Sequence, residues 1–213
     1  MHRKEAILKI EELVGVDLRP LADKYGVTVW KEGKINKGWA GHVIERYLGL
    51  PLNSSRSPNF GSWELKVVPL KRNRKDELIV KETMAITMID AVEVAAKEFE
   101  DSHVFNKLQK MVVVSRVFES KAETSSLLHA VATFDLDNPY VFAQAKDDYN
   151  LIRETILTTG FLSLTGRMGI IVQPRTKGKG HGTTSRAFYA RKNFVAHILN
   201  INRLPFVPVV ETD

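Results

Sequence analysis

The sequence predicts an α/β fold in which a mixed sheet is flanked by helices. Residues 111–118 form a nearly continuous apolar run, which is typical of a strand that is covered on both faces. Residues 62–70 and 77–89 have strand-like patterns, and the polar connector between them predicts a hairpin. Segments with a helical period lie on both sides of these strands, so we expect helices to pack against the sheet.

The N-terminal third contains three predicted helices. Apolar residues in 3–14 recur at a helical spacing, and residues 18–25 predict a short second helix that ends at Gly26. Residues 37–49 predict a third helix, with small residues near its start and a glycine as its C-terminal stop. The Ser-, Asn- and Pro-rich segment 53–60 is a loop that leads into the first strand.

The C-terminal half continues the alternation. We expect a helix over residues 145–157, a short strand over 169–173 and an amphipathic helix over 188–200. A glycine-rich loop over residues 177–182 separates the last two elements.

Length and composition predict one domain that spans residues 1–213. No apolar run approaches the roughly 20 residues that cross a bilayer, and the N-terminus lacks a signal-peptide core, so we expect a soluble, cytoplasmic protein without a membrane partner. The chain has no cysteine, which excludes disulfides, thiolate metal sites and a cysteine nucleophile. Any metal ion must therefore be held by oxygen or imidazole.

The net charge of +6 is unevenly distributed. Residues 155–210 contain eight Lys or Arg and no Asp or Glu, whereas the rest of the chain is close to neutral. A basic region at about 165–205 is the pattern expected of a surface that faces the phosphates of double-stranded DNA. The alternatives from charge alone are a solubilising face and a patch for anionic lipid.

The strongest chemical motif is the pair Glu64 and Lys66. Two positions apart on a strand, these side chains lie on the same face. The carboxylate can hold a hard divalent cation, and the ammonium can orient a water or offset the charge of a phosphate. The alternative is a solvated charge pair on a surface strand. Asn59 stands five residues earlier, where a metal site would want a second carboxylate.

Blocks of sequence around this motif resemble a known family. They comprise residues 37–49 with the Lys-Gly-Trp-Ala-Gly start, residues 58–66 with Pro-Asn-Phe and Glu-Leu-Lys, residues 186–194, and a weaker match at 102–108. In these blocks, and in their order, the chain is similar to the MutH mismatch-repair nickase and the related restriction endonucleases MvaI and BcnI.

The resemblance implies a restriction-endonuclease-like fold with two lobes around a DNA cleft. It also implies a metal site in which Glu64 and the backbone carbonyl of Leu65 are ligands and Lys66 positions the attacking water. Asn59 falls on the missing first carboxylate. Glu45 matches an auxiliary acidic residue and Lys107 a second active-site lysine; the alternatives for these two are a surface ion pair and a solvated helix charge.

The implied activity is that of a type II restriction endonuclease: a monomer that hydrolyses phosphodiester bonds in duplex DNA, one strand at a time, by in-line attack of a metal-bound water. Magnesium is the expected metal because the ligands are hard oxygens. Two alternatives stay open: a non-catalytic DNA-binding module, and a repair nickase that needs a protein activator.

The amide of Asn59 bears directly on activity. It keeps the shape of a carboxylate but removes a full charge from the cation's shell, so DNA binding should survive and cleavage should not. Asn59 is then an inactivating substitution made to capture intact DNA, or a natural loss of activity. A third possibility is that Asp76, Glu77 or Asp90 supplies the carboxylate from a neighbouring strand.

The segment 173–186, followed by a helix that starts near Phe188, predicts the element that reads the DNA sequence. Arginine reads guanine through O6 and N7, which makes Arg175 and Arg186 the expected base readers. The remaining expected DNA contacts are groove contacts by His181 and Tyr189, and phosphate contacts by Lys177, Lys179, Arg191 and Lys192. Alternatively, all of them contact phosphates without specificity. The step from Asn59 to Glu64 and the two arginines favour the branch that reads CC-N-GG-type sites over the GATC-reading branch.

Overall fold

The chain divides into two compact units. The structure is a computed structural model that describes residues 1–50, 58, 61–178 and 184–208. Unit 1 comprises Met1–Glu82 and Met111–Thr133, and unit 2 comprises Thr83–Lys110 and Phe134–Asp213. The single domain expected over residues 1–213 stays a prediction. Within the described ranges, no helix is long and apolar enough to cross a membrane.

Unit 1 contains a mixed four-stranded sheet with the order β4-β3-β6-β7. Its strands are β3 (Glu64–Arg72), β4 (Leu78–Val80), β6 (Lys110–Val117) and β7 (Leu128–Asp135). β3 pairs antiparallel with β4 and parallel with β6, which confirms the mixed sheet and the predicted hairpin. β6 is buried on both faces from Met111 onward, as its apolar run predicts.

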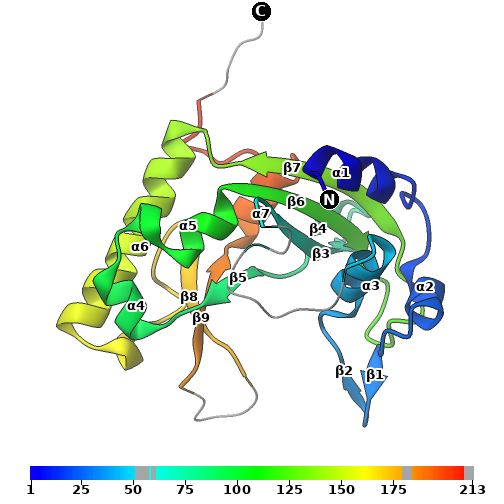
Figure 1. The fold of residues 1–213 in the computed structure, drawn as a ribbon, viewed down its shortest axis with the longest axis horizontal. Coiled ribbons are helices and arrows are strands. Elements are labelled where there is room, and N and C mark those ends of the chain that lie inside the picture. Colours follow the sequence, from blue (N-terminus) through cyan, green and yellow to red (C-terminus); the bar gives the residue numbers. More distant parts are fainter. Residues whose placement is uncertain (51–57, 59–60, 179–183, 209–213) are drawn as a thin grey trace, which may run out of the picture. The chain divides into compact units, whose positions relative to one another are not determined.

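Three helices pack on this sheet (Figure 1). They are α1 (Arg3–Glu11), α2 (Leu18–Lys24) and α3 (Trp39–Tyr47), close to the predicted ranges. The Asp17 side chain accepts a hydrogen bond from the Arg19 backbone N–H and so caps α2. The core of unit 1 joins apolar residues of all three helices, such as Ile10, Leu18 and Ile44, to Leu65 of β3 and Val112 of β6.

A short hairpin that the sequence did not predict joins α2 to α3. It consists of β1 (Trp30–Lys31) and β2 (Lys34–Ile35) and appears at the lower right of Figure 1. The two turn residues, Glu32 and Gly33, have φ values of 50° and 69°. Positive φ at both central positions is the mark of a type I′ turn, whose twist matches that of the paired strands.

Unit 2 contains an antiparallel three-stranded sheet with the order β5-β9-β8. Its strands are β5 (Met84–Met88), β8 (Val172–Thr176) and β9 (Arg186–Ala190). Its helical elements are α4 (Ala91–Ala96), η1 (Phe99–Asp101), α5 (His103–Leu108), α6 (Pro139–Thr158), η2 (Phe161–Ser163) and α7 (Lys192–Ile198). Phe99 packs edge-on against Phe105 and Phe142, and Tyr149 stacks on Phe188 of β9, so aromatic rings join the helices to the sheet.

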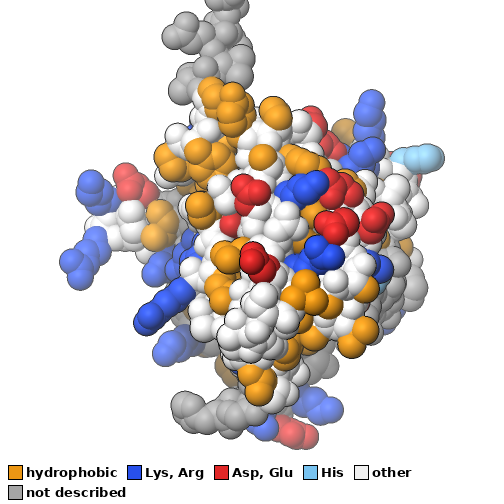
Figure 2. Space-filling view, turned by 90° about the vertical axis from the view of Figure 1, so that its left-hand side faces the viewer, with side chains coloured by type: hydrophobic (Ala, Val, Ile, Leu, Met, Phe, Trp, Pro, Cys, Tyr) orange, Lys and Arg blue, Asp and Glu red, His pale blue; other side chains and the backbone are white. Residues whose placement is uncertain are grey.

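Ion pairs connect the helices at the surface of unit 2. Lys146 of α6 lies 2.6 Å from Glu100 of η1, and Arg153 of α6 lies 3.1 Å from Glu98. The hydrogen bond from Lys146 holds the pKa of Glu100 below its usual value. Figure 2, which views the left-hand side of Figure 1, shows acidic and basic side chains interspersed with apolar ones rather than a patch of a single charge.

Two predicted elements are wrong. Residues 77–89 are not one strand: β4 pairs with β3, whereas β5 pairs with β9 in the other sheet. The charged residues Lys81 and Glu82 interrupt the pattern at this change of sheet. Residues 188–200 are not one helix, because residues 186–190 form the central strand β9 and the helix begins only at Lys192.

Other boundaries differ by a few residues. The helix expected over 145–157 begins at Pro139, where the Asn138 side chain accepts hydrogen bonds from the backbone N–H groups of Tyr140 and Val141. The strand expected over 169–173 is β8, shifted toward the C-terminus. The loop predicted over residues 53–60 lies outside the described residues, except for Pro58.

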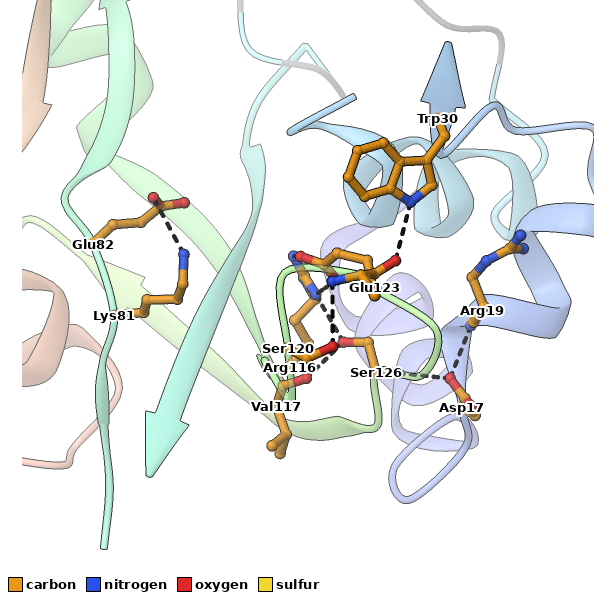
Figure 3. A network of polar contacts seen from close by, with 11 residues as sticks. Asp17, Arg19, Trp30, Lys81, Glu82, Arg116, Val117, Ser120, Glu123 and Ser126 are labelled. Atoms are coloured by element: carbon orange, nitrogen blue, oxygen red, sulfur yellow. Dashed lines mark hydrogen bonds and ion pairs between the residues drawn. The ribbon is translucent and has the colours of Figure 1, made fainter. Parts of the chain in front are cut away.

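A buried ion pair fixes the loop between β6 and β7 in unit 1 (Figure 3). The Arg116 guanidinium donates to both carboxylate oxygens of Glu123, at 2.7 and 3.0 Å, and to the Ser126 hydroxyl at 2.9 Å. It also lies 5.1 Å from the ring centroid of Trp39 in α3. Ser126 in turn donates its backbone N–H to Asp17 at 2.8 Å. The pair therefore ties β6 to the starts of α2 and α3.

Candidate active site

Glu64 is the first residue of β3, and its side chain is only 1% exposed. β3 lies between β4 and β6, and Glu64 stands in register with Met111 of β6. Trp63 and Leu65, its neighbours in the chain, are also buried. A carboxylate is rarely buried without a partner, because removing its charge from water costs free energy. Glu64 is therefore not the solvated surface charge of the alternative interpretation.

Lys66 supplies that partner. Its Nζ lies 2.7 Å from the Oε1 of Glu64, and its side chain is 20% exposed. Both residues project from the same face of β3, as the spacing of two predicts. The arrangement places a carboxylate in a water-poor setting beside an ammonium group that still reaches solvent. It can bind a hard cation at one end and a phosphate oxygen at the other.

Glu45 belongs to the same unit. It is partly buried on α3, a helix that packs against β3 through its apolar face of Trp39, Val43 and Ile44. The auxiliary role expected of Glu45 stays a prediction.

Lys107 lies in unit 2, on α5, and is only 7% exposed. A lysine so deeply buried is uncommon, so it is not the solvated helix charge of the alternative. Its role beside a scissile phosphate stays a prediction. Asn59 lies outside the described residues.

The candidate site contains oxygen donors. Across residues 1–50, 58, 61–178 and 184–208, no group of three or more His, Asp or Glu side chains is placed to hold a metal ion. The described donors are the Glu64 carboxylate and the Leu65 backbone carbonyl, both hard oxygens of the kind that Mg²⁺ prefers. Because Mg²⁺ keeps several waters and needs only one or two carboxylates, these donors fit the ion in type.

Two of the three proposed substitutes for the missing carboxylate are wrong. Asp76 and Glu77 lie in the turn between β3 and β4, where Asp76 pairs with Arg72 at 3.2 Å. Arg72 is the last residue of β3, about 26 Å from Glu64 at the usual rise per residue. Asp90 caps α4 of unit 2 by accepting from the backbone N–H groups of Val92 and Glu93, and its role as a substitute stays a prediction.

Three of the expected DNA-reading residues, Arg175, Arg186 and Tyr189, lie on the strands of a β-hairpin rather than on a loop and a helix. Arg175 is exposed on β8, where it donates to the Thr83 hydroxyl at 2.8 Å and lies 5.7 Å from the ring centroid of Tyr189. Arg186 opens β9, and Lys177 is exposed just after β8. Arg175 and Tyr189 thus form one contiguous group in unit 2. Lys179 and His181 lie outside the described residues.

Arg191 and Lys192 follow β9 and differ from each other. Lys192 is exposed at the start of α7. Arg191 donates to the backbone carbonyls of Gly166, Met168 and Gly169 at 2.9 Å each, so its guanidinium holds the turn that leads into β8. The phosphate contacts expected of both stay predictions.

Sequence reasoning missed the residue that holds this turn from its other side. Asp148 of α6 is 2% exposed and accepts from the backbone N–H groups of Ile170, Ile171 and Val172 at 2.7–2.8 Å. Gly169 has a φ of +74°, and a Cβ there would lie 1.8 Å from the Val172 carbonyl oxygen. The one signal in the sequence was the glycine just before a strand, which marks a close approach of two backbone segments.

Comparisons with known proteins identify the family. The model of the family "DNA mismatch repair enzyme MutH" matches residues 48–154, half of the chain. This range contains Glu64, Lys66 and Lys107, but neither Glu45 nor the β8–β9 hairpin.

Whole-chain relatives and a solved structure also match. The DNA mismatch repair protein MutH of Vibrio cholerae is 26% identical over 92% of this chain and 95% of its own length. The Shewanella woodyi protein of the same name is 27% identical over 92% and 90%. The restriction endonuclease MvaI, solved with its cognate DNA, aligns at 11% identity over 85% of this chain and 93% of its own, with a TM-score of 0.34. The match of the family model over half of the sequence shows that the chain belongs to the MutH family.

Proposed function

We propose that this protein is a magnesium-dependent endonuclease that hydrolyses phosphodiester bonds in duplex DNA, with its reaction centre at Glu64 and Lys66. The observation that carries the proposal is the buried carboxylate of Glu64 with an ammonium 2.7 Å away, at the start of a central strand inside the family match. A charged side chain is rarely buried unless a partner or a metal ion compensates it, and Lys66 leaves this pair partly open to solvent.

The residues would divide the reaction between them. Glu64 and the Leu65 carbonyl would hold Mg²⁺ together with the side chain at position 59. When bound, the ion lowers the pKa of a coordinated water and neutralises charge on the phosphate. Lys66 would orient the attacking water and stabilise negative charge on the phosphate oxygens through its exposed ammonium group. Lys107 would approach the same phosphate, and Glu45 would add negative charge on the metal side.

The hairpin of β8 and β9 would position the DNA. Arg175 and Arg186 would read guanines in the major groove, with Tyr189 and His181 as groove contacts. Lys177, Lys179, Arg191 and Lys192 would contact phosphates. A base reader and a phosphate contact are separable, because alanine at the first relaxes specificity at one position and alanine at the second weakens all sequences alike.

A repair nickase is favoured over a type II restriction endonuclease. The curated relatives carry the name of a mismatch repair protein, and they match 92% of this chain. Such an enzyme would cut one strand and would respond to a protein activator.

The change Asn59→Asp tests the proposal. It restores the negative charge that a cation needs, so we expect Mg²⁺-dependent nicking of supercoiled plasmid to rise at least about 100-fold, with little change in DNA affinity. Asn59→Ala is the matched control and should stay inactive. Glu64→Gln in the Asn59→Asp chain should abolish the gain. If the Asn59→Asp chain neither binds nor cuts duplex DNA, the proposal is refuted.

A non-catalytic DNA-binding module is the second candidate, and the neutral side chain of Asn59 favours it. This second hypothesis predicts a different result for the Asn59→Asp chain. The Asn59→Asp chain would bind duplex DNA with the affinity of the parent chain and would leave the plasmid intact at every Mg²⁺ concentration.

A further inference from the structure

The β1–β2 hairpin of unit 1 has two faces of different character. Trp30 stands opposite Ile35, and Lys31 stands opposite Lys34. Side chains of directly opposed residues lie on the same face of a hairpin, and neighbouring pairs lie on opposite faces. One face therefore carries Trp30 and Ile35, and the other carries two lysines.

The apolar face is tied to the rest of unit 1. The Trp30 indole N–H donates to the Ala122 carbonyl at 3.0 Å, on the loop that the Arg116–Glu123 pair holds (Figure 3). Asn36 closes the base of the hairpin: its backbone N–H donates to the Val29 carbonyl at 2.9 Å, and its side chain to the Thr28 carbonyl at 3.0 Å. These contacts give the hairpin a fixed orientation within unit 1.

The lysine face carries two like charges, and the neighbouring acidic residue is Glu32 in the turn between them. Both lysines are exposed, and in the part of the chain that the structure describes neither forms an ion pair. Like charges directly opposite each other destabilise a strand pair. The β3–β4 turn of the same unit is different, because there Arg72 is paired with Asp76 at 3.2 Å. Repulsion between the opposed lysines thus destabilises the hairpin in the free protein. A bound polyanion would neutralise their charges and relieve this repulsion.

We propose that Lys31 and Lys34 form a second DNA-contact surface, which binds the phosphates of a duplex without reading its sequence. The inference rests on the proposed function. It adds a DNA contact in unit 1 to the DNA contacts that we propose for the β8–β9 hairpin of unit 2. Duplex DNA fits this surface because two adjacent ammonium groups on a rigid turn match a regular row of phosphates, and because amines on phosphates carry no base specificity.

The test measures binding of a fluorescent duplex to the full chain over a series of salt concentrations. Each phosphate contact contributes about 0.9 to the slope of log K against log salt. The double variant Lys31→Ala/Lys34→Ala should therefore lower the slope by about 1.8 and weaken binding about 10- to 100-fold at 0.1 M salt, equally for all sequences. The matched control is Lys71→Ala/Lys75→Ala, which removes the same charge from exposed positions at the end of β3 and in the β3–β4 turn. It should leave the slope unchanged.

Trp30 provides a local readout. It is 43% exposed, whereas Trp39 and Trp63, the other two tryptophans, are 0% and 1% exposed. Because Trp30 is the chain neighbour of Lys31, on the other face of the same hairpin, DNA bound to the lysines should change the emission of the parent chain, and Trp30→Phe should remove that change.

The outcomes separate the two proposals. An unchanged slope in the double-lysine variant, with binding still lost in Arg175→Ala, overturns the hairpin inference and leaves the proposed function intact. A slope that falls equally in the Lys71/Lys75 control also overturns it, because the effect would then be one of net charge. Failure of the parent chain to bind any duplex overturns both.

Discussion

The two buried ion pairs of unit 1 differ in how completely they are enclosed. Arg116 and Glu123 have side chains that are 7% and 4% exposed, and they are joined by two hydrogen bonds. Glu64 is as deeply buried, but its partner Lys66 is 20% exposed. A pair closed on both sides can only hold structure together. A pair open on one side can exchange its partner for a substrate or a cation, so burial alone does not distinguish a structural pair from a reactive one.

The largest expected effect is on the closed pair. Arg116→Ala leaves the Glu123 carboxylate buried without its cation, so we expect a loss of about 3–5 kcal/mol in the free energy of unfolding. Urea unfolding followed by circular dichroism measures it. Arg116→Lys keeps the charge but not the paired hydrogen bonds. Its free energy of unfolding should therefore lie between those of the parent chain and of Arg116→Ala. A loss below about 1 kcal/mol would show that the pair is not a structural element.

At the open pair, Glu64 and Lys66, a substitution should lower catalytic activity rather than stability. In the Asn59→Asp chain, Glu64→Gln keeps the shape of the side chain and removes the charge, so plasmid nicking should fall at least about 100-fold, equivalent to about 2.7 kcal/mol in the barrier. DNA affinity should stay within about threefold, and unfolding should change less than in Arg116→Ala. A variant that loses stability but keeps its nicking rate would reverse the assignment of the two pairs.

The smallest expected effect lies at the edge of the closed network. Burial acts to raise the pKa of Asp17, but the hydrogen bonds from the Arg19 and Ser126 backbone N–H groups outweigh it and lower the pKa below its usual value of 3.8. A lowered pKa in the folded state gives stability that is present above the unfolded value and is lost as the pH falls through the folded value.

Asp17→Ala should therefore lower stability by about 0.5–2 kcal/mol at neutral pH, as expected for the loss of a helix cap, and should reduce the loss of stability below pH 4. Thermal unfolding between pH 2 and 7 measures both. A variant with the same acid dependence as the parent would show that Asp17 does not contribute to it.

Local patterns predicted the parts of unit 1 that depend on nearby residues. The apolar run of β6 reflects its burial on both faces, and the hairpin of β3 and β4 follows from a short polar connector. The Glu64–Lys66 contact follows from the period of the strand alone. That the pair is buried was not predictable from the two residues, because the covering side chains come from other segments.

The secondary-structure predictions were wrong where a strand pairs with residues that are far away in the sequence. Tyr189 of β9 pairs with Ala85 of β5, and Phe188 stacks on Tyr149, so contacts far along the chain decide that this segment is a strand. The spacing of its apolar residues is also compatible with a helix. Pairing with distant strands outweighs this local preference. The Arg116–Glu123 pair was missed for the same reason, because a lone arginine in an apolar run does not reveal a partner on the following loop.

The chain passes between the two units at residues 82–83, 110–111 and 133–134. Neither unit is therefore a continuous stretch of sequence, and a cut at any one of these points separates segments that belong to the same unit. During synthesis, unit 1 cannot complete its sheet before β7 has emerged, and β5 must wait for β9, which is made about one hundred residues later. Such long-range pairing slows folding and leaves β5 as an unpaired edge in the nascent chain, so the protein is most open to aggregation while it is still being made.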